Sequence, residues 1–277
     1  MVKISIQGAR GSYHDIVARR KFPGESEIIE SPTYRQVFED VKNGLADYGV
    51  VAIENSSFGS FLENYDLLVK YDIQIVAEAY LHIILDLIAL PGTRLNEIEE
   101  IYSHPQALTD CHPFLEQHPK MRRVETDDTA GSVRMIKENK MAKAAAIGSK
   151  LAAQIYGMSV LASNIGANKK NYTRFLIITR EHEAGPNVDK TSLVMRVKNT
   201  SGSLFNCLKC FADEGINLCK LESRPIIGDN WQYYFYIDFE RAVNEPPTQR
   251  ALACLGKNTT MMRVLGTYPK GSMMEGL

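Results

Sequence analysis

The sequence lacks the features that mark membrane-spanning and nucleic-acid-binding proteins. Its longest apolar run, at residues 83–90, is broken by Asp86 and is too short to span a bilayer. Acidic residues number 33 and lysine plus arginine number 32, and because the two signs are intermixed, no basic stripe indicates a nucleic-acid surface. Residues 1–8 are typical of a strand and not of a signal peptide. We therefore expect a cytoplasmic location, with neither a nucleic acid nor a membrane as a partner.

Cysteine is scarce, with five residues in the chain. Cys207 and Cys210 form a CxxC motif, but no second pair and no nearby histidine completes a set of zinc ligands. Both fit the apolar stripe of a helix, together with Leu204, Leu208 and Phe211. We therefore expect these two cysteines to pack in a core and not to carry redox or metal chemistry.

Signatures of several enzyme classes are missing as well. The sequence has no HExxH motif, no glycine-rich phosphate loop of the Walker type, no Ser-His-Asp order and no acidic pairs with the spacing of a metal site. It therefore predicts neither a metal nor a cofactor. Any catalysis would come from hydroxyl, amide, imidazole, carboxylate and guanidinium groups alone.

Strand-like and helix-like segments alternate through the first two thirds of the 277 residues, which favours an α/β fold with largely parallel sheets. The composition, at 44% hydrophobic and 23% charged, is that of a soluble globular protein of about two domains. The expected strands are 3–7, 48–53, 98–102, 122–125, 144–147 and 174–179, and residues 73–90 read as extended. The expected helices are 12–21, 34–43, 105–117, 128–139 and 149–156.

The pattern changes after a charged and then Gly/Pro/Asn-rich stretch, which we interpret as a linker at residues 182–189. Strands are expected beyond it at 191–197, 216–222, 231–239 and 261–268, and helices at 201–213 and 247–255. This βαββαβ order is that of a ferredoxin-like domain. Because residues 233–237 are apolar on both faces of their strand, we expect this domain to pair with another copy.

Five polar clusters stand where an expected strand ends or an expected helix begins. They are Gly8-Ala9-Arg10-Gly11-Ser12-Tyr13, Glu54-Asn55-Ser56-Ser57, Ser103-His104-Pro105-Gln106-Ala107, Thr126-Asp127-Asp128-Thr129-Ala130 and Asn171-Tyr172-Thr173-Arg174-Phe175. Taken singly, each cluster is explained about as well by a turn or a helix cap as by a ligand site. In open α/β sheets, however, ligands bind beyond the carboxyl ends of the strands, so the five together favour one shared cleft.

These groups suit a small dicarboxylate. Arg174 offers a fork for a carboxylate, Thr173 offers a hydroxyl donor, and free amides at helix starts, such as the one capped by Ser12, favour an anion. Such a set can hold a dianion and assist the departure of an oxygen. It indicates an elimination that is driven by the substrate and needs no cofactor.

The motifs resemble those of a known family. Ile53-Glu54-Asn55-Ser56, His104-Pro105-Gln106-Ala107 and Asn171-Tyr172-Thr173-Arg174-Phe175 occur in this order and spacing in prephenate dehydratases, as does the early Gly-x-x-Gly-Ser-Tyr. The C-terminal region resembles the family's ACT regulatory domain through Gly202-Ser203-Leu204 and Asn217-Leu218-x-x-x-Glu222-Ser223-Arg224-Pro225. The resemblance extends over essentially the whole chain. The sequence departs from the family pattern at Ala9, Ala52, Ala167 and Ser201, where proline or, at 167, an acidic residue is usual.

The resemblance implies a fold. The catalytic region would occupy residues 1–181 as two α/β lobes, similar to type II periplasmic binding proteins, with the active site between them. Lobe one would comprise 1–76 and 162–181, and lobe two 77–161. A ferredoxin-like βαββαβ (ACT) domain would occupy 190–277.

The resemblance also implies an activity, the decarboxylating dehydration of prephenate to phenylpyruvate by a hydro-lyase without metal or cofactor. Thr173 would donate toward the leaving hydroxyl, and Glu54 and His104 are candidates for a proton relay. The expected substrate-binding residues are Ser12, Asn55, Ser56, Gln106, Arg174 and Phe175. Two alternatives stay open: an arogenate dehydratase, and a non-catalytic two-lobed sensor of amino acids or small acids.

Regulation by phenylalanine is implied by the ACT domain. The effector would bind at a dimer interface of that domain, and the protein would be a homodimer or a homotetramer. The residues expected at this site are Gly202, Ser203, Leu204, Asn217, Leu218, Glu222, Ser223 and Arg224.

Overall fold

The computed structural model describes residues 1–181, 185 and 187–276, which form two compact units. The first unit comprises residues 1–61, 79–175 and 273–277, and the second comprises 62–78 and 176–272. The linker expected at 182–189 falls partly on residues 182–184 and 186, which lie outside the described residues. The boundaries that the sequence suggests for the lobes and the C-terminal domain stay predictions.

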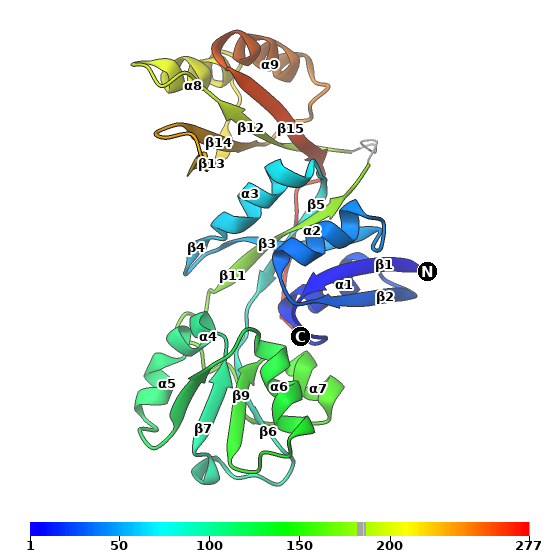
Figure 1. Ribbon diagram of the computed structural model, residues 1–277, viewed down its shortest axis with the longest axis vertical. Coiled ribbons are helices and arrows are strands. Elements are labelled where there is room, and N and C mark those ends of the chain that lie inside the picture. The colour runs from blue at the N-terminus through cyan, green and yellow to red at the C-terminus, as the bar shows by residue number, and fades with distance from the viewer. Residues whose placement is uncertain (182–184, 186, 277) are drawn as a thin grey trace. The chain divides into compact units, whose positions relative to one another are not determined.

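The first sheet is built around the amino-terminal strand. Its order is β16-β5-β11-β3-β1-β2, and β4 pairs with β3. The strands are β1 (Val2–Gln7), β2 (Ser26–Ser31), β3 (Tyr48–Asn55), β4 (Gly59–Ser60), β5 (Gln74–His82), β11 (Tyr172–Thr179) and β16 (Met273–Met274). Strand β1 is parallel to both of its neighbours, β2 and β3, and helices α1 (Tyr13–Lys21) and α2 (Tyr34–Lys42) make the crossovers (Figure 1). The carboxyl ends of β1 and β3 therefore meet at one edge of the sheet.

The second sheet is also in the first unit, with the order β10-β6-β9-β7-β8. Its strands are β6 (Asp86–Ala89), β7 (Glu100–Ser103), β8 (Arg122–Glu125), β9 (Ala144–Gly148) and β10 (Ser159–Ala162). In Figure 1, α4 (Pro105–Asp110) and α5 (His112–Glu116) lie on one side of it, and α6 (Thr129–Glu138) and α7 (Lys150–Tyr156) on the other. A short 3₁₀ helix, Leu95–Glu97, precedes β7.

Strand β9 shows why the central strands are continuous apolar runs. Ala145 and Ile147 pack into one core cluster with Leu108 and Leu115, whereas Ala144 and Ala146 pack into another with Val133 and Ile136. Alternate residues thus face helices on opposite sides of the sheet, and both faces are buried. This confirms the predicted mixed α/β class.

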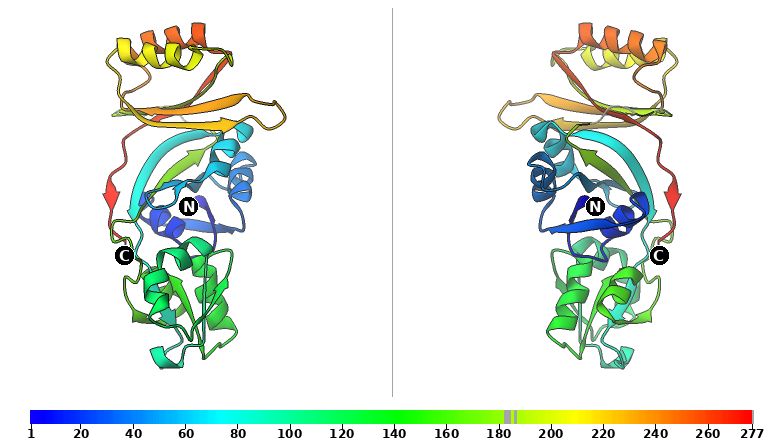
Figure 2. Two further views of the ribbon diagram at one scale, coloured as in Figure 1. Left: turned by 90° about the vertical axis from the view of Figure 1, so that its left-hand side faces the viewer. Right: turned by 90° about the vertical axis from the view of Figure 1, so that its right-hand side faces the viewer.

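The third sheet lies in the second unit and has the order β13-β14-β12-β15, with every pair antiparallel. Its strands are β12 (Lys190–Arg196), β13 (Leu218–Pro225), β14 (Tyr233–Phe239) and β15 (Met261–Tyr268). Helices α8 (Ser203–Asp213) and α9 (Pro246–Asn258) lie side by side over one face of it (Figure 2). The predicted βαββαβ order is confirmed. Helix α3 (Leu62–Tyr71) belongs to the same unit.

The cysteines of this unit correct one expectation. Cys207 and Cys210 are buried in its core, as the helical stripe predicts. Cys210, however, forms a disulfide with Cys254, which joins α8 to α9. The CxxC spacing did not predict this bond. The partner of Cys210 lies 44 residues away, on a helix that the sheet topology places beside α8.

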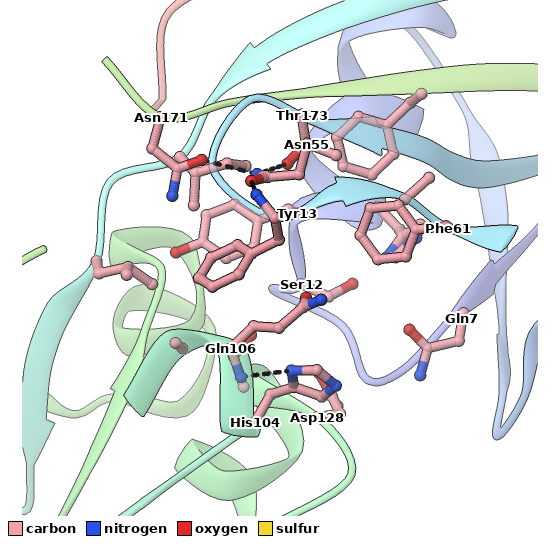
Figure 3. A pocket seen from close by; sticks show the side chains of 18 of the residues that line it. Gln7, Ser12, Tyr13, Asn55, Phe61, His104, Gln106, Asp128, Asn171 and Thr173 are labelled. Carbon is pink, nitrogen blue, oxygen red and sulfur yellow. Dashed lines mark hydrogen bonds between the residues drawn. The ribbon is translucent and has the colours of Figure 1, made fainter. Parts of the chain in front are cut away.

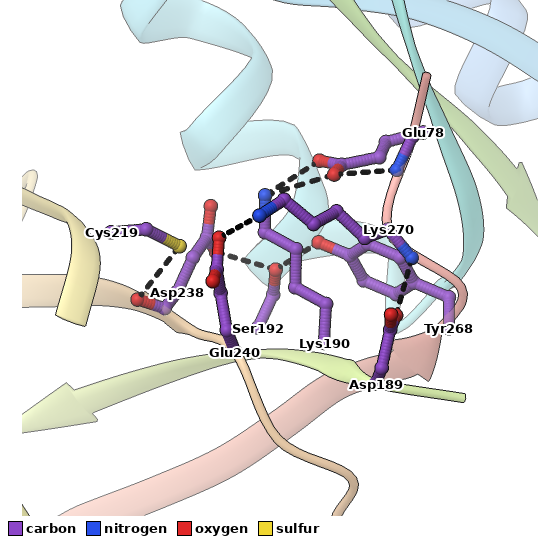
Figure 4. A network of polar contacts seen from close by, with 10 residues as sticks. Glu78, Asp189, Lys190, Ser192, Cys219, Asp238, Glu240, Tyr268 and Lys270 are labelled. Carbon is purple, nitrogen blue, oxygen red and sulfur yellow. Dashed lines mark hydrogen bonds and ion pairs between the residues drawn. The ribbon is translucent and has the colours of Figure 1, made fainter. Parts of the chain in front are cut away.

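A buried ion pair ties β12 to the first part of β5 within the second unit (Figure 4). The Nζ atom of Lys190 donates to both carboxylate oxygens of Glu78, at 2.9 and 2.8 Å, and the backbone N–H of Gly271 donates to the same carboxylate at 3.0 Å. Both side chains are almost fully excluded from solvent. Because the two charges are paired and hydrogen-bonded, their burial is tolerated.

Several elements differ from the expected pattern. Residues 105–117 form two helices and not one, because the chain turns at Cys111 and Pro113 stands in the first turn of α5, where its missing N–H costs no helical bond. Strand β2 and helix α3 were not expected, since both sequences mix polar and apolar residues without a strong period. Within the described residues, no helix is both long enough and apolar enough to cross a bilayer.

Candidate active site

A cavity of about 130 Å³ in the first unit is lined by residues from both of that unit's sheets and their connecting loops (Figure 3). The end of β3, the start of α1 and the start of β11 contribute Asn55, Ser12 and Thr173. The β7–α4 and β8–α6 loops contribute His104 and Asp128. All five polar clusters of the sequence therefore have members on one cavity wall.

Asn55, the last residue of β3, organises this wall. Its Oδ1 atom accepts hydrogen bonds from the backbone N–H groups of Ser57 at 2.8 Å and Phe58 at 3.0 Å. Because backbone N–H groups can only donate, these bonds fix the orientation of the amide. Its Nδ2 atom then donates to Oδ1 of Asn171 at 2.7 Å and to Oγ1 of Thr173 at 2.8 Å.

The hydroxyl of Thr173 is thereby directed. Its oxygen accepts from Asn55, and within the described part of the chain its own hydrogen meets no acceptor. The side chain is buried and lies on the cavity wall. The O–H donor is therefore available to a molecule in the cavity.

The network continues through Asn171 to Asp110, which also lines the cavity. The Nδ2 atom of Asn171 donates to Oδ2 of Asp110 at 3.0 Å, and the backbone N–H of Asn168 donates to the other carboxylate oxygen of Asp110 at 3.2 Å. A second contact fixes the same segment, because the N–H of Ile83 donates to the carbonyl of Asn171 at 2.8 Å. The start of β11 is thus held rigidly behind Thr173.

Asp128 connects the loop after β1 with the start of α6. Its carboxylate caps the helix by accepting from the N–H groups of Ala130 and Gly131, at 3.1 and 2.7 Å, and it also accepts from Ala9 at 2.8 Å. Gly8 has φ +87°, and a Cβ atom there would lie 2.9 Å from this carboxylate. A glycine is therefore required by both the turn and the close approach. The capping interpretation of this cluster fits its geometry.

His104 is the N-cap of α4. Its Nδ1 atom accepts from the backbone N–H of Gln106 at 3.3 Å, so the neutral ring carries its hydrogen on Nε2. Burial lowers the pKa of His104, against the opposing influence of the carboxylates of Asp128, Asp127 and Glu125. The ring is therefore neutral near neutral pH and offers one N–H donor.

The remaining wall is aromatic: Phe175 was expected there, whereas His14, Tyr34 and Phe61 were not. His14 meets Phe175 edge to face with ring centroids 5.0 Å apart, and it meets Tyr34 at 5.5 Å. Tyr34 in turn contacts Phe61, at 6.2 Å between centroids. Burial lowers the pKa of His14 to about 3, so this imidazole is neutral. The sequence places His14 in the first turn of α1, close to the N-cap. It does not show whether a residue at that position contacts a ligand or packs in the core.

Three expected site residues do not line the cavity. Arg174 is 5% exposed and Glu54 is half-buried, and each precedes a cavity-lining residue of its strand, Phe175 and Asn55. Successive side chains of a strand point to opposite faces, so Arg174 lies on the other face of β11 from Thr173 and Phe175. Ser56 holds the chain: its hydroxyl accepts from the N–H of Tyr172 at 2.9 Å. The roles expected of Arg174 and Glu54 stay predictions.

The other expected residues, Ser12, Asn55, His104, Gln106, Thr173 and Phe175, all line the cavity. Three acidic residues line it as well: Asp110, Asp127 and Asp128. None of the described lining residues is a lysine or an arginine. Nor do the described residues contain a group of three or more His, Cys, Asp and Glu side chains placed to hold a metal ion.

The residues expected to bind an effector lie in the second unit, and their role stays a prediction. Gly202 is the N-cap of α8, whereas Asn217 follows that helix. A helix of 11 residues is about 16 Å long, at roughly 1.5 Å per residue. Arg224 forms an ion pair with Asp66 of α3, at 2.5 and 3.1 Å.

Comparison with known proteins agrees with this geometry. Residues 4–183 match the family model described as prephenate dehydratase. The chain is 37% identical to arogenate dehydratase 2 of Petunia hybrida over 98% of this chain and 72% of that protein. It is 33% identical to the bifunctional chorismate mutase/prephenate dehydratase of Aquifex aeolicus, over 99% and 75%.

Among solved structures, the chain resembles prephenate dehydratase of Arthrobacter aurescens in complex with L-Phe. The TM-score is 0.88 at 30% identity, and the match covers 97% of this chain and 90% of that one. The family model covers more than half of the chain, and the likeness to the relatives is close to full length. The chain belongs to the prephenate dehydratase family of hydro-lyases.

Proposed function

We propose that the protein catalyses the decarboxylating dehydration of prephenate to phenylpyruvate in the cavity between the two sheets of the first unit. The observation that carries the proposal is the Asn55–Thr173 contact, which leaves a buried hydroxyl donor aimed at the ligand space. A non-catalytic sensor would need groups that hold a carboxylate, but it would not need a directed donor held by a network of amides.

The reaction breaks two bonds. The bond from the ring to its carboxylate breaks, CO₂ leaves, and the electron pair forms a ring double bond. The C–O bond on the opposite side of the ring breaks with its pair on oxygen, which takes a proton and leaves as water. Aromaticity supplies the driving force, so the enzyme must orient the ring and stabilise the departing oxygen.

Thr173 is the proposed donor to that oxygen. A threonine hydroxyl is a poor acid, so it stabilises the developing charge by a hydrogen bond while the proton comes from water or from a second group. Among the expected relay candidates, His104 lines the cavity with an N–H to donate, and Glu54 does not line it. His104 is therefore the better candidate for assisting the leaving group or holding a carboxylate.

Because Arg174 is not among the described residues that line the cavity, we propose other partners for the substrate carboxylates. Helix α1 begins at the cavity behind its N-cap Ser12, and α6 begins there behind Asp128. The N-terminal ends of helices carry partial positive charge and favour anions. With the amide of Gln106 and the hydroxyl of Ser12, these groups would hold the dianion.

Arogenate is the second candidate substrate, because its side chain carries an ammonium group in place of the keto group. The cavity wall contains three carboxylates and, among the described lining residues, no cationic side chain, which is a better match to a ligand with one positive charge. Asp127 is the exposed member of the three. Asp127→Asn should then lower kcat/KM for arogenate more than for prephenate.

We further propose that the second unit contains an ACT domain that binds phenylalanine between two copies. The separation of Gly202 from Asn217 along α8 supports this, because a site using both ends would need the second copy to supply one of them. The protein would then be a homodimer or a homotetramer. Analytical ultracentrifugation with and without phenylalanine tests this directly.

The test of the activity is an assay of the purified protein with prephenate and with arogenate, following phenylpyruvate and phenylalanine respectively. Turnover of either substrate supports the enzyme and identifies its preference. Tight binding of both without turnover would instead support the sensor.

A further inference from the structure

His14 is a buried polar side chain whose hydrogen-bonding groups are unused. The residue is 8% exposed, and its Nε2 atom is buried without a hydrogen-bond partner. In the part of the chain that the structure describes, no donor or acceptor bonds to either ring nitrogen, and the ring's contacts are the edge-to-face packings with Tyr34 and Phe175. Buried polar atoms are normally paired, and leaving one unpaired costs about 1–3 kcal/mol.

The location of His14 indicates what would satisfy it. The residue lines the cavity of the proposed active site. Its neighbour Phe175 is two residues from Thr173 on β11, so both side chains lie on the same strand face, about 7 Å apart. The imidazole and the hydroxyl of Thr173 thus both belong to the lining of this cavity.

The surroundings of His14 also indicate which chemical group of the ligand would contact it. Neither ring that packs against His14 carries a charge, so an uncharged polar group of the ligand is the simplest partner for the neutral imidazole. A hydroxyl is uncharged and both donates and accepts, as a neutral imidazole does. The ring hydroxyl of the substrate is therefore the group that fits this wall.

We propose that His14 is a catalytic residue that hydrogen-bonds the ring hydroxyl of the bound substrate, opposite the hydrogen bond from Thr173. This inference rests on the proposed dehydratase function and goes beyond it by assigning a second donor to the leaving group.

The role is electrostatic stabilisation and not proton donation. As the C–O bond breaks and its electron pair moves to oxygen, a neutral N–H strengthens its hydrogen bond to the growing negative charge. The imidazole keeps its proton, because giving it up would leave an imidazolate, and the proton of the water formed comes from solvent or from another group. The low pKa of His14, caused by burial, keeps the ring in this neutral form.

The test compares His14→Phe with His14→Asn. Phenylalanine preserves an aromatic ring in the wall but removes both polar atoms, whereas asparagine keeps a donor and an acceptor. We expect His14→Phe to lower kcat about 100-fold, in the range measured for single donors to a developing oxyanion, and His14→Asn to lose less. Phenylpyruvate, which lacks the ring hydroxyl, should inhibit the wild type and His14→Phe with the same constant within about twofold.

Two outcomes would overturn the inference. One is an unchanged kcat in His14→Phe. The other is a parallel loss of phenylpyruvate inhibition, which would show that His14 only shapes the cavity. The failure of the underlying function is distinguishable, because a wild-type protein that turns over neither prephenate nor arogenate would reject the dehydratase proposal before any variant is made.

Discussion

The Nδ2 atom of Asn55 lies 2.8 Å from Oγ1 of Thr173, although 118 residues separate them along the chain. Asn55, the last residue of β3, also accepts two backbone N–H groups, and Thr173, the second residue of β11, follows Asn171, whose amide donates to Asp110. The oxygen of Thr173 accepts from Asn55, so its O–H can donate to a molecule in the cavity. A geometry prepared in this way needs no reorganisation when charge develops on the substrate.

Replacing Thr173 by valine removes the donor and preserves the shape of the side chain. We expect kcat to fall about 100-fold or more, because one positioned donor contributes roughly 3–4 kcal/mol in oxyanion sites, while KM changes little. Thr173→Ser keeps the hydroxyl and should retain most of the activity. Steady-state kinetics on both variants decides the matter: a lower kcat with serine as severe as with valine would assign the loss to packing.

The order of the elements could be read from the sequence because it depends on local signals. The buried runs of β3 and β9 and the capped starts at Ser12, Asp128 and Ser149 each combine an apolar pattern with a specific capping residue. The disulfide between Cys210 and Cys254 could not be predicted from the sequence, because it depends on how α8 and α9 pack together. Contacts of this kind follow from topology and not from spacing.

The site shows both the use and the limit of motif reasoning. The motifs predicted which loops meet at the cavity, but they did not distinguish the residues that line it from their neighbours in the sequence. The two-residue period of a strand separates Asn171, Thr173 and Phe175 from Arg174. That period was already readable in the sequence. The role proposed for His14 could not be predicted from the sequence, since it depends on the tertiary environment of the ring.

The ion pair between Arg224 and Asp66 connects the proposed effector motif to α3, the helix that follows the cavity-lining residue Phe61. Phenylalanine is expected to change the KM for the substrate by some factor. Asp66→Asn should reduce that factor by up to about fivefold, because part of the coupling free energy between the two sites is lost. Asp72→Asn is the matched control, since Asp72 directly follows α3 and forms a separate ion pair, with Arg263. Equal effects of the two variants would contradict a specific role for Asp66.

The disulfide between Cys210 and Cys254 closes a loop with a sequence separation of 44 residues. Breaking it should lower the free energy of unfolding of the second unit by about 2–4 kcal/mol, since the unfolded chain gains conformational freedom. Urea unfolding of wild type with and without dithiothreitol, and of Cys254→Ser, measures the effect. Cys219→Ser is the control, because Cys219 is not part of the disulfide. Equal urea midpoints for wild type and Cys254→Ser would mean that the bond does not form in solution.

The neutral state of His14 also predicts how stability depends on pH. Burial lowers its pKa to about 3, whereas an unfolded histidine titrates near about 6.5. Between these values the unfolded chain binds a proton that the folded protein does not, so stability falls as the pH falls, by at most about 1.4 kcal/mol per pH unit. His14→Phe removes this contribution. Urea unfolding at pH 7, 6 and 5 should therefore show wild type losing stability relative to the variant by more than about 1 kcal/mol, and parallel curves would mean that the folded protein binds the proton.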